Sequence, residues 1–286
     1  MVPMGSAESK QNRLEERQQY YREVIRGYTM MSDTFMRNVL KDRSCAEYVL
    51  QVILDREDLK ILSVAVQQDY KNLQGRSAVL DCVAQDSDGM LYDIEVQQEE
   101  EGSSALRARY YSSLMDMNTL DPGKDFDRLP ETCVIFITGH DVLREGRPIY
   151  HIKRVIQESG NRFPDLSLII YVNASIQDDS SLGNLIHDFH CRNAADIHSP
   201  VLAERVRALK ETPQGVESMC REMKEIEEYG IKKGRKEGIE EGMLRERKSA
   251  VQNMLGKGMS IEAIADLMGL SESQVRECIS GDTASA

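Results

Sequence analysis

Long apolar runs are missing from this 286-residue sequence, which also has no tryptophan. Its longest apolar segments, 133–138 and 166–172, are far shorter than the roughly 20 residues that a membrane-spanning helix needs, so they predict buried strands. Residues 1–21 contain no apolar stretch of the kind found in secretory signals. We therefore expect no membrane partner and a cytoplasmic location.

Paired cysteines are also missing. None of the six cysteines belongs to a CxxC pair. This spacing argues against both a disulfide framework and a zinc site made of thiolates. We expect reduced and mostly buried thiols at Cys45, Cys82, Cys133, Cys191, Cys220 and Cys278.

Basic residues do not outnumber acidic residues in this sequence. The chain has 36 Lys and Arg against 48 Asp and Glu, a formal net charge of -12. Proteins that bind nucleic acids gain much of their affinity from Lys and Arg contacts to phosphate, so this charge argues against such a partner. A local basic stripe at a binding cleft would overcome the objection, because the local field matters more than the total charge.

The pattern of apolar residues predicts one main domain of mixed α and β structure. Period-two segments at 59–70, 75–84 and 90–98 indicate three strands in a meander, and 132–138 and 166–172 two further buried strands. Helices are expected at 8–28, 33–40, 46–54, 105–118 and 182–209. Strands flanked by helices indicate an α/β (α+β) core with a mixed central sheet.

The character of the chain changes near residue 213, where it becomes highly charged and helical. Gly230, Gly234, Gly238 and Gly242 recur at every fourth position, on one face of a helix where two backbones could approach. A packed helix pair, within one chain or in a homodimer, is one interpretation. A flexible charged linker is the other, because each Gly inside a helix costs about 1 kcal/mol relative to Ala.

Residues 259–279 predict two short amphipathic helices around Gly269, with Ser271 as cap of the second. They resemble a helix-turn-helix, but the second helix offers Arg276 as its cation beside Glu272 and Glu277, which disfavours reading of a DNA groove. A packing or dimerisation module is the alternative. The expected domains are an N-terminal helix (1–30), the α/β domain (31–212), the Gly-spaced helical segment (213–250) and this C-terminal module (251–286).

The segment 75–98 carries the chemistry. A three-residue loop ending at Gly89 would pair two strands so that Asp81 faces Glu95 and Val83 faces Asp93. Because side chains alternate along a strand, the carboxylates of Asp81, Asp93 and Glu95 would share one face with the carboxamide of Gln97. Like charges repel at that spacing, so the cluster predicts a bound cation. The opposite face would hold Leu80, Cys82, Ala84, Tyr92, Ile94 and Val96.

An all-oxygen site of this kind suits Mg²⁺, with Mn²⁺ as an alternative. Asp81 and Glu95 are the expected metal ligands, and Gln97 is expected to orient the attacking water. A cation there would polarise a phosphate and lower the pKa of water. A solvated hairpin face is the alternative interpretation of the same residues.

The pattern of one Asp followed by ExQ after a short hairpin resembles the PD-(D/E)xK nucleases. The run 107–141 is similar to the PD-(D/E)xK nuclease family transposases, close to the Rpn family of recombination-promoting nucleases. The resemblance implies a restriction-endonuclease-like core and a divalent-metal-dependent DNA endonuclease, which hydrolyses phosphodiester bonds and promotes recombination or transposition. It assigns the catalytic positions to Asp81, Glu95 and Gln97.

Gln97 departs from the family pattern, which has a lysine there. Glutamine carries no positive charge for the transition state, so a nearby cation must replace it. Arg107 and Arg109 are the candidates for this role and for phosphate contact, and the helix phase decides which of them faces the site. Tyr110 and Tyr111 pack beside them.

The resemblance also implies a further acid on a helix before the sheet, and both Asp33 and Glu47 qualify. His187, His190 and Cys191 lack a fourth ligand for zinc in the sequence, so we interpret them as packing residues. Two functional alternatives stay open. One is a catalytically weakened module, toxin-like or acting by binding DNA or protein, which Gln97 and the acidity favour. The other is a nuclease for RNA.

Overall fold

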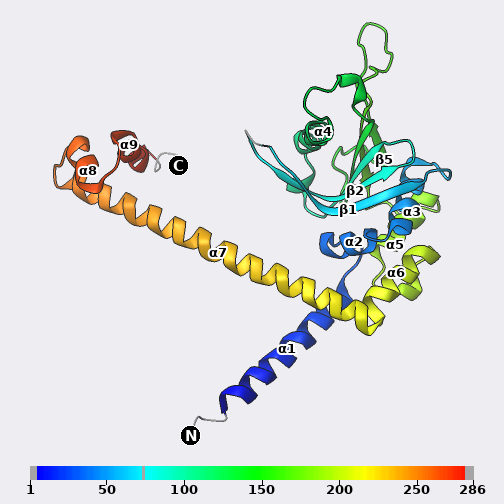
Figure 1. Cartoon of the computed structure of the whole chain (residues 1–286), viewed down its shortest axis with the longest axis horizontal. Helices are drawn as coiled ribbons and strands as arrows, with labels where there is room; N and C mark the ends of the chain where they lie inside the picture. The colour runs from blue at the N-terminus through cyan, green and yellow to red at the C-terminus, as the bar shows by residue number, and fades with distance from the viewer. Residues whose placement is uncertain (1–4, 73–74, 281–286) are drawn as a thin grey trace. The chain divides into compact units, whose positions relative to one another are not determined.

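The computed structural model describes the backbone of residues 5–72 and 75–280 and the side chains of residues 16–72, 75–99 and 102–279 (Figure 1). The chain divides into two compact units, residues 1–220 and residues 221–286, and each is described by itself. None of the described helices is long and apolar enough to cross a membrane.

A six-stranded mixed sheet forms the centre of the first unit, with the strand order β1-β2-β3-β4-β6-β5. The three strands β1, β2 and β3 form the antiparallel meander that the sequence predicts, and β3, β4 and β6 run parallel. The short strand β5 pairs antiparallel with β6 at the edge. The strands are β1 (Ile61–Tyr70), β2 (Ala78–Asp86), β3 (Leu91–Gln97), β4 (Thr132–Thr138), β5 (Ile149–Ile152) and β6 (Ser167–Asn173).

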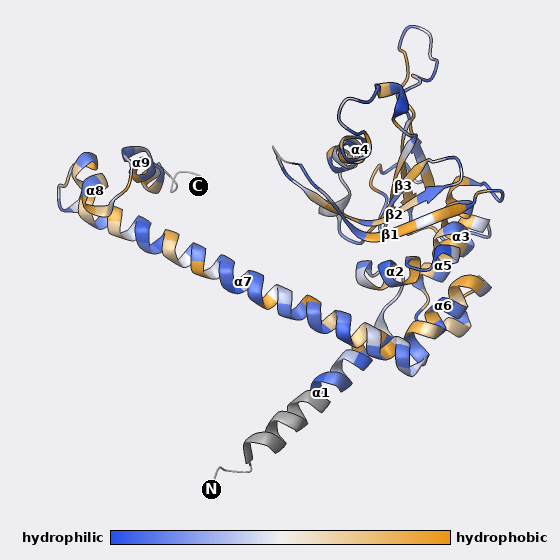
Figure 2. Ribbon diagram, viewed as in Figure 1, coloured by the Kyte–Doolittle hydropathy of each residue, from blue (hydrophilic) through white to orange (hydrophobic). Residues whose placement is uncertain are grey.

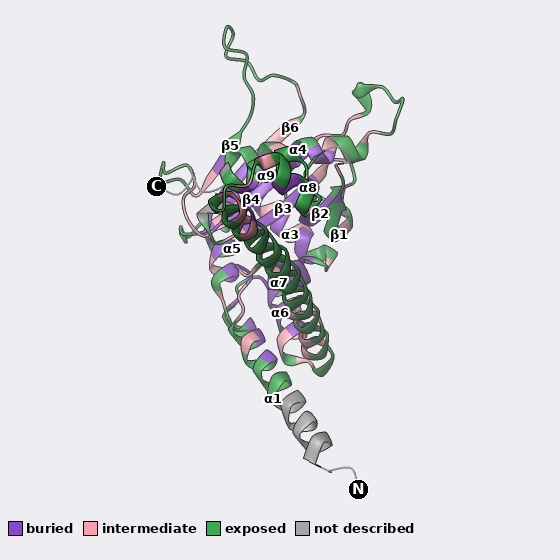
Figure 3. Ribbon diagram, turned by 90° about the vertical axis from the view of Figure 1, so that its left-hand side faces the viewer, coloured by how far each residue is buried: buried purple, intermediate pink, exposed green. Residues whose placement is uncertain are grey.

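Helices cover both faces of this sheet, which confirms the predicted fold class (Figure 1). Helix α4 (Ala105–Thr119) lies on one face, and α2 (Asp33–Leu40) and α3 (Arg43–Leu54) lie on the other, with α5 (Ser181–His190) and α6 (Pro200–Glu211) packed beyond them. Helix α1 (Gly5–Gly27) precedes them. Figure 2 shows the central strands as the most hydrophobic part of the unit, and Figure 3 shows them buried.

The hairpin between β2 and β3 has the register that the sequence predicts. Cys82 pairs with Ile94, and Val83 pairs with Asp93. Gly89 has a φ of 88°, in the left-handed region that glycine adopts without strain. The amide of Gly89 donates to the carbonyl of Asp86, which closes the loop.

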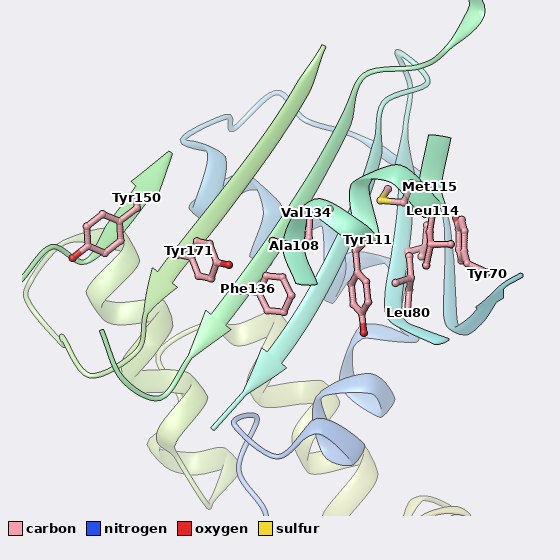
Figure 4. Close-up of a cluster of buried hydrophobic side chains, with 11 residues drawn as sticks. Tyr70, Leu80, Ala108, Tyr111, Leu114, Met115, Val134, Phe136, Tyr150 and Tyr171 are labelled. Carbon is pink, nitrogen blue, oxygen red and sulfur yellow. The ribbon is translucent and has the colours of Figure 1, made fainter. Parts of the chain in front are cut away.

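A cluster of buried side chains fills the space between α4 and the sheet (Figure 4). Phe136 lies at its centre, with its ring 6.2 Å from that of Tyr111 and 5.5 Å from that of Tyr171. Both pairs are stacked, and aromatic pairs at such distances contribute about 0.5–1.5 kcal/mol beyond their buried area. This cluster fixes α4 over the strands that carry the carboxylates.

One prediction about the hairpin faces was wrong. Simple alternation places Leu80 and Val83 on opposite faces, but both pack in the cluster beneath α4, whereas Cys82 does not. The irregularity coincides with Asp81: the pairing between β1 and β2 skips this residue, and Gln67 opposite it has a φ of 52°. The local twist lets Asp81 reach α2, away from the cluster.

The single helix expected over 182–209 is two helices. Helix α5 ends at His190, and α6 begins at Pro200 after a 3₁₀ turn, η3 (Ala194–Asp196). The physical reason is a start signal: Pro200 at the first turn has no amide hydrogen to donate, and the Ser199 side chain accepts from the amide of Leu202. Strand β5 has only four residues and was not predicted.

The second unit has a small core of its own. Helix α7 (Pro213–Gly256), most of which belongs to this unit, is continuous through its glycines, which favours the helical over the flexible interpretation of this segment. The predicted pair of short helices is confirmed as α8 (Ile261–Met268) and α9 (Glu272–Ser280), with Gly269 left-handed between them. The core residues come from the end of α7 and from both short helices: Val251, Ile264, Ala265, Val275 and Cys278. Figure 2 shows that the rest of α7 is mostly hydrophilic.

Candidate active site

Asp81 on β2 and Glu95 on β3 lie across the hairpin from each other, as the sequence predicts. The amide of Asp81 donates a hydrogen bond to Oε1 of Glu95 at 2.9 Å. Glu95 is wholly buried and Asp81 is 8% exposed. Two carboxylates in such surroundings are uncommon in a folded protein unless they are paired or bind a cation.

Arg107 on α4 is the cation beside Glu95. Its Nη2 lies 3.3 Å from Oε2 of Glu95, and its Nη1 donates to the carbonyl of Gly102 at 2.8 Å. Its Nε donates to the hydroxyl of Tyr111 at 2.8 Å, and the guanidinium lies 4.9 Å from the centre of the Tyr111 ring. Three hydrogen bonds and a stacked ring hold the guanidinium in one orientation.

Arg37 on α2 is the cation beside Asp81, and the sequence analysis missed it. Its Nη1 lies 3.2 Å from Oδ1 of Asp81 and 2.7 Å from Oδ1 of Asp33, so it bridges the two carboxylates. Arg37 is 8% exposed. The sequence does carry a signal for this ion pair. Arg37 lies within the apolar run of a short helix, four residues after Asp33, and positions four apart share a helix face.

Asp33 and Glu47, the two candidate helical acids, have different surroundings. Asp33 lies close enough to Asp81 to raise its pKa. Glu47 accepts from Nζ of Lys60 and from the amide of Ile61, both at 2.9 Å. Glu47 therefore joins α3 to the start of β1, and Asp33 is the helical acid that lies beside the carboxylates.

Gln97 ends β3 next to Gly102. A Cβ added to Gly102 would lie 1.9 Å from Oε1 of Gln97, so this carboxamide occupies the space beside the glycine. The same added atom would lie 3.4 Å from Nη1 of Arg107, which places Gln97 and Arg107 against one short stretch of backbone. The guanidinium thus lies beside the position where the family pattern has a lysine.

Arg109 does not take part in this arrangement. Its side chain is exposed, whereas Arg107 is half-buried beside Glu95. Tyr111 is buried in the cluster under α4, and the hydroxyl of Tyr110 contacts the carbonyl of Arg76 and the side chain of Asn72. The helix phase that the sequence left open therefore places Arg107 toward the carboxylates.

Asp93 is the most deeply buried carboxyl group of the site. It is 0% exposed, and within the described residues neither of its oxygens has a hydrogen-bond partner. The interpretation as a solvated hairpin face is therefore wrong for Asp93. Burial, together with the charges of Glu95 and Asp81, raises the pKa of Asp93 well above its ordinary value. A neutral, protonated Asp93 is the form that such surroundings favour.

The pKa values of the two main carboxyl groups are also raised. Burial and the charge of Asp33 raise the pKa of Asp81 to about 6, although Arg37 and Arg107 lower it. Burial and the charge of Asp81 raise the pKa of Glu95 to about 8, against the opposing effect of the Asp81 amide and of Arg107. The arginines therefore only partly offset the cost of burying these charges.

The carboxylate oxygens of Asp81 and Glu95 are of the chemical type that a divalent metal ion prefers. Four carboxyl groups, those of Asp33, Asp81, Asp93 and Glu95, lie close enough to influence one another's pKa values, and two guanidinium groups lie beside them, so acidic groups outnumber cations. Carboxylates buried close together repel one another, and a bound cation relieves that repulsion. Mg²⁺ and Mn²⁺ prefer carboxylate oxygens and need few protein ligands.

Comparison with known proteins agrees with this geometry. Residues 47–178 match the model of the PD-(D/E)XK nuclease family transposases. The matched range contains Asp81, Glu95, Gln97 and Arg107, while Asp33 and Arg37 precede it. No curated protein and no solved structure matches the chain. Residues 47–178, with their mixed sheet and buried carboxylates, therefore form a domain of the PD-(D/E)XK nuclease family transposases.

Proposed function

We propose that the chain is a divalent-metal-dependent DNA endonuclease that hydrolyses phosphodiester bonds. The observation that carries this proposal is the buried pair of Asp81 and Glu95, joined by the hydrogen bond from the Asp81 amide, within a nuclease-family domain. Burying two carboxylates side by side costs free energy that the fold alone does not need. A catalytic metal ion accounts for that cost.

Asp81 and Glu95 are the proposed metal ligands. When bound there, Mg²⁺ or Mn²⁺ supplies polarisation of the scissile phosphate and a lowered pKa of the attacking water. Arg37 holds the Asp81 carboxylate from one side, and Arg107 holds Glu95 from the other. Both arginines thereby restrict the rotamers of the ligands before the substrate arrives.

Two residues, Gln97 and Arg107, together replace the lysine of the family pattern. The carboxamide of Gln97 donates or accepts a hydrogen bond and so orients water, but it is uncharged. The guanidinium of Arg107 supplies the positive charge that stabilises the developing negative charge on phosphate. Arg109, exposed on the same helix, is proposed only as an outer phosphate contact.

The biological setting follows from the family. Its members are nuclease family transposases, so cleavage that promotes recombination or transposition is the proposed role. We also propose that the chain is close to the Rpn recombination-promoting nucleases, in which case recombination is the process that it promotes. The expected location is the cytoplasm.

A catalytically weakened protein that binds DNA or protein is the second candidate. Two observations favour it: the uncharged Gln97 at the lysine position and the net charge of -12, which opposes binding to DNA. Its activity would be slow or absent while the fold stayed intact. A cleavage assay on the purified protein distinguishes the two candidate functions.

The deciding experiment measures nicking and linearisation of a supercoiled plasmid by the full chain with Mg²⁺, Mn²⁺ or EDTA, at low and moderate salt. Asp81→Asn is the test variant, and Asp88→Asn on the exposed hairpin loop is the matched control. Metal-dependent cleavage that Asp81→Asn loses and Asp88→Asn keeps would support the endonuclease. An inactive wild-type chain would support the weakened candidate, and cleavage confined to an added RNA would replace DNA as the substrate.

We also propose a homodimer through the C-terminal helices. Gly230, Gly234, Gly238 and Gly242 have no atom within 4 Å of an added Cβ within the described part of the chain, so this helix face is open. Light scattering after size exclusion tests the proposal. A monomeric mass at all concentrations would contradict it, and so would a dimer that persists after substitution of Gly234 and Gly238 by Leu.

A further inference from the structure

A second group of metal-binding side chains lies at the end of α5. The ligand atoms of His187, Asp188 and Cys191 all lie within 4.8 Å of one another. Among the side chains that the structure describes, this is the one group of three His, Cys, Asp or Glu residues that meets this distance. His187 and Cys191 are four residues apart at the last turn of the helix, which places them on one face.

The distances match the edges of a zinc tetrahedron. Nδ1 of His187 lies 3.4 Å from Oδ1 of Asp188 and 3.7 Å from Sγ of Cys191. Zinc bonds of ordinary length at tetrahedral angles separate nitrogen from oxygen by about 3.4 Å and nitrogen from sulfur by about 3.6 Å. Sγ of Cys191 also lies 3.9 Å from Nε2 of His187, so a turn of this ring is needed before the three side chains can share one ion.

His198 is the candidate for a fourth ligand, which the sequence alone does not show. Its ring stacks on that of His187 at 4.2 Å, and its Nδ1 lies 3.9 Å from Oδ1 of Asp188. The His198 side chain is 59% exposed, so it is free to turn toward the ion. It follows the 3₁₀ turn η3, and the sequence alone does not show that this turn folds back on α5.

Backbone hydrogen bonds fix the orientation of the Asp188 carboxylate. It is 1% exposed, and its two oxygens accept hydrogen bonds from the amides of His198, at 2.7 Å, and Ser199, at 2.9 Å. Each oxygen keeps a further lone pair. Ligands fixed by such outer hydrogen bonds bind metals more tightly, because little rotamer freedom is lost on binding.

The Cys191 thiol faces His187 from outside the helix. Besides the imidazole, its Sγ contacts the carbonyl oxygens of His187 and Asp196, each at 3.4 Å. Bound zinc lowers the pKa of a coordinating thiol enough to deprotonate it.

We propose that His187, Asp188, Cys191 and His198 bind one zinc ion. The mixed nitrogen, sulfur and oxygen donors suit this borderline-soft ion and not Mg²⁺, which the all-oxygen site at Asp81 and Glu95 suits. The ion would fasten the end of α5 to the segment that leads into α6, because Asp188 already joins the two through backbone hydrogen bonds. Its role is structural and independent of the nuclease chemistry.

The test uses the full chain with excess Mg²⁺, which competes with zinc for the proposed all-oxygen site. Zn²⁺ binding is measured by competition with a coloured chelator, and Co²⁺ replaces zinc to report thiolate ligation through its sulfur-to-cobalt absorption band. Cys191→Ser and His187→Ala are the test variants. Cys220→Ser, another half-buried free cysteine, and His190→Ala, whose ring contacts the carbonyl of Ala174, are the matched controls.

The expected result is one equivalent of zinc for the wild-type chain and both controls, with affinity at least about tenfold lower in both test variants. The cobalt band should vanish in Cys191→Ser alone among the cysteine variants. His198→Ala, at an exposed position, should weaken binding without harm to the fold, which circular dichroism checks. No saturable zinc binding by the wild-type chain would overturn the proposal, and so would a cobalt band that survives Cys191→Ser.

Discussion

The amide of Asp81 donates to Oε1 of Glu95 across 2.9 Å, so the backbone of one proposed metal ligand orients the side chain of the other. The hairpin register places the two residues opposite each other, and the irregular pairing of β1 with β2 turns Asp81 toward Arg37. Each carboxylate then has an arginine from a different helix. The two flanking helices and the hairpin together build the site.

Removing either ligand should abolish cleavage. Asp81→Asn and Glu95→Gln keep the size of the side chain but lose the charge that binds the metal, so plasmid nicking should fall below detection with Mg²⁺ or Mn²⁺. Circular dichroism should be unchanged for both. Undiminished nicking by either variant would sink the assignment of these ligands.

The two candidate helical acids should behave in opposite ways. Asp33→Asn should slow cleavage, because Asp33 shares Arg37 with Asp81. Glu47→Gln should leave cleavage unchanged and lower the free energy of unfolding by about 1 kcal/mol, since it weakens the hydrogen bonds from Lys60 and Ile61. Nicking rates and urea unfolding measure both effects. Loss of activity in Glu47→Gln alone would reverse the roles that we propose.

The two arginines of α4 should differ as well. Arg107→Lys retains the charge but cannot reach Glu95, Gly102 and Tyr111 together, so cleavage should slow by about 10- to 100-fold. Arg109→Lys, on the exposed side of the same helix, is the matched control and should cleave at close to the wild-type rate. Equal losses in both variants would show that the helix contributes charge and not a positioned guanidinium.

Stability of the metal-free chain should fall as the pH rises. The pKa of Glu95 is about 8 in the folded chain, against about 4.3 for a free glutamate, so protonated Glu95 stabilises the fold fully only below the lower value. That stabilisation is lost as the pH rises through about 8. Asp81, with a pKa of about 6, adds to the loss in the same direction.

Urea unfolding in EDTA between pH 5 and pH 9 would measure this effect. Glu95→Gln cannot ionise, so its stability should change less with pH than that of the wild-type chain. Added Mg²⁺ should flatten the wild-type profile, because a bound cation favours the ionised carboxylates. A wild-type profile that rises from pH 5 to pH 9 in EDTA would contradict the burial of these charges.

The stacked rings beneath α4 should dominate the stability of the first unit. Phe136→Ala removes the ring between Tyr111 and Tyr171, and substitutions of this kind cost about 3–5 kcal/mol. Phe126→Ala, at a side chain 80% exposed, is the control and should cost less than about 0.5 kcal/mol. Similar unfolding midpoints for the two variants would show that the cluster does not hold the helix on the sheet.

Local patterns in the sequence determined most of the strands, the helix α4 and the pairing of Asp81 with Glu95. Each depends on interactions over a few residues: alternation along a strand, a turn glycine at position 89, and helical spacing after the hairpin. The domain family also followed from the sequence, because the motif and the run after it lie within the matched range.

Only the tertiary structure decided which charged groups surround the carboxylates. Arg37 and Asp33 precede the hairpin by more than 40 residues, and their approach depends on how α2 packs against the sheet. The burial of Asp93 and the position of His198 beside α5 likewise depend on contacts between different elements. Periodicity indicates which face of an element is buried, but the partner across that face is set by packing of the whole domain.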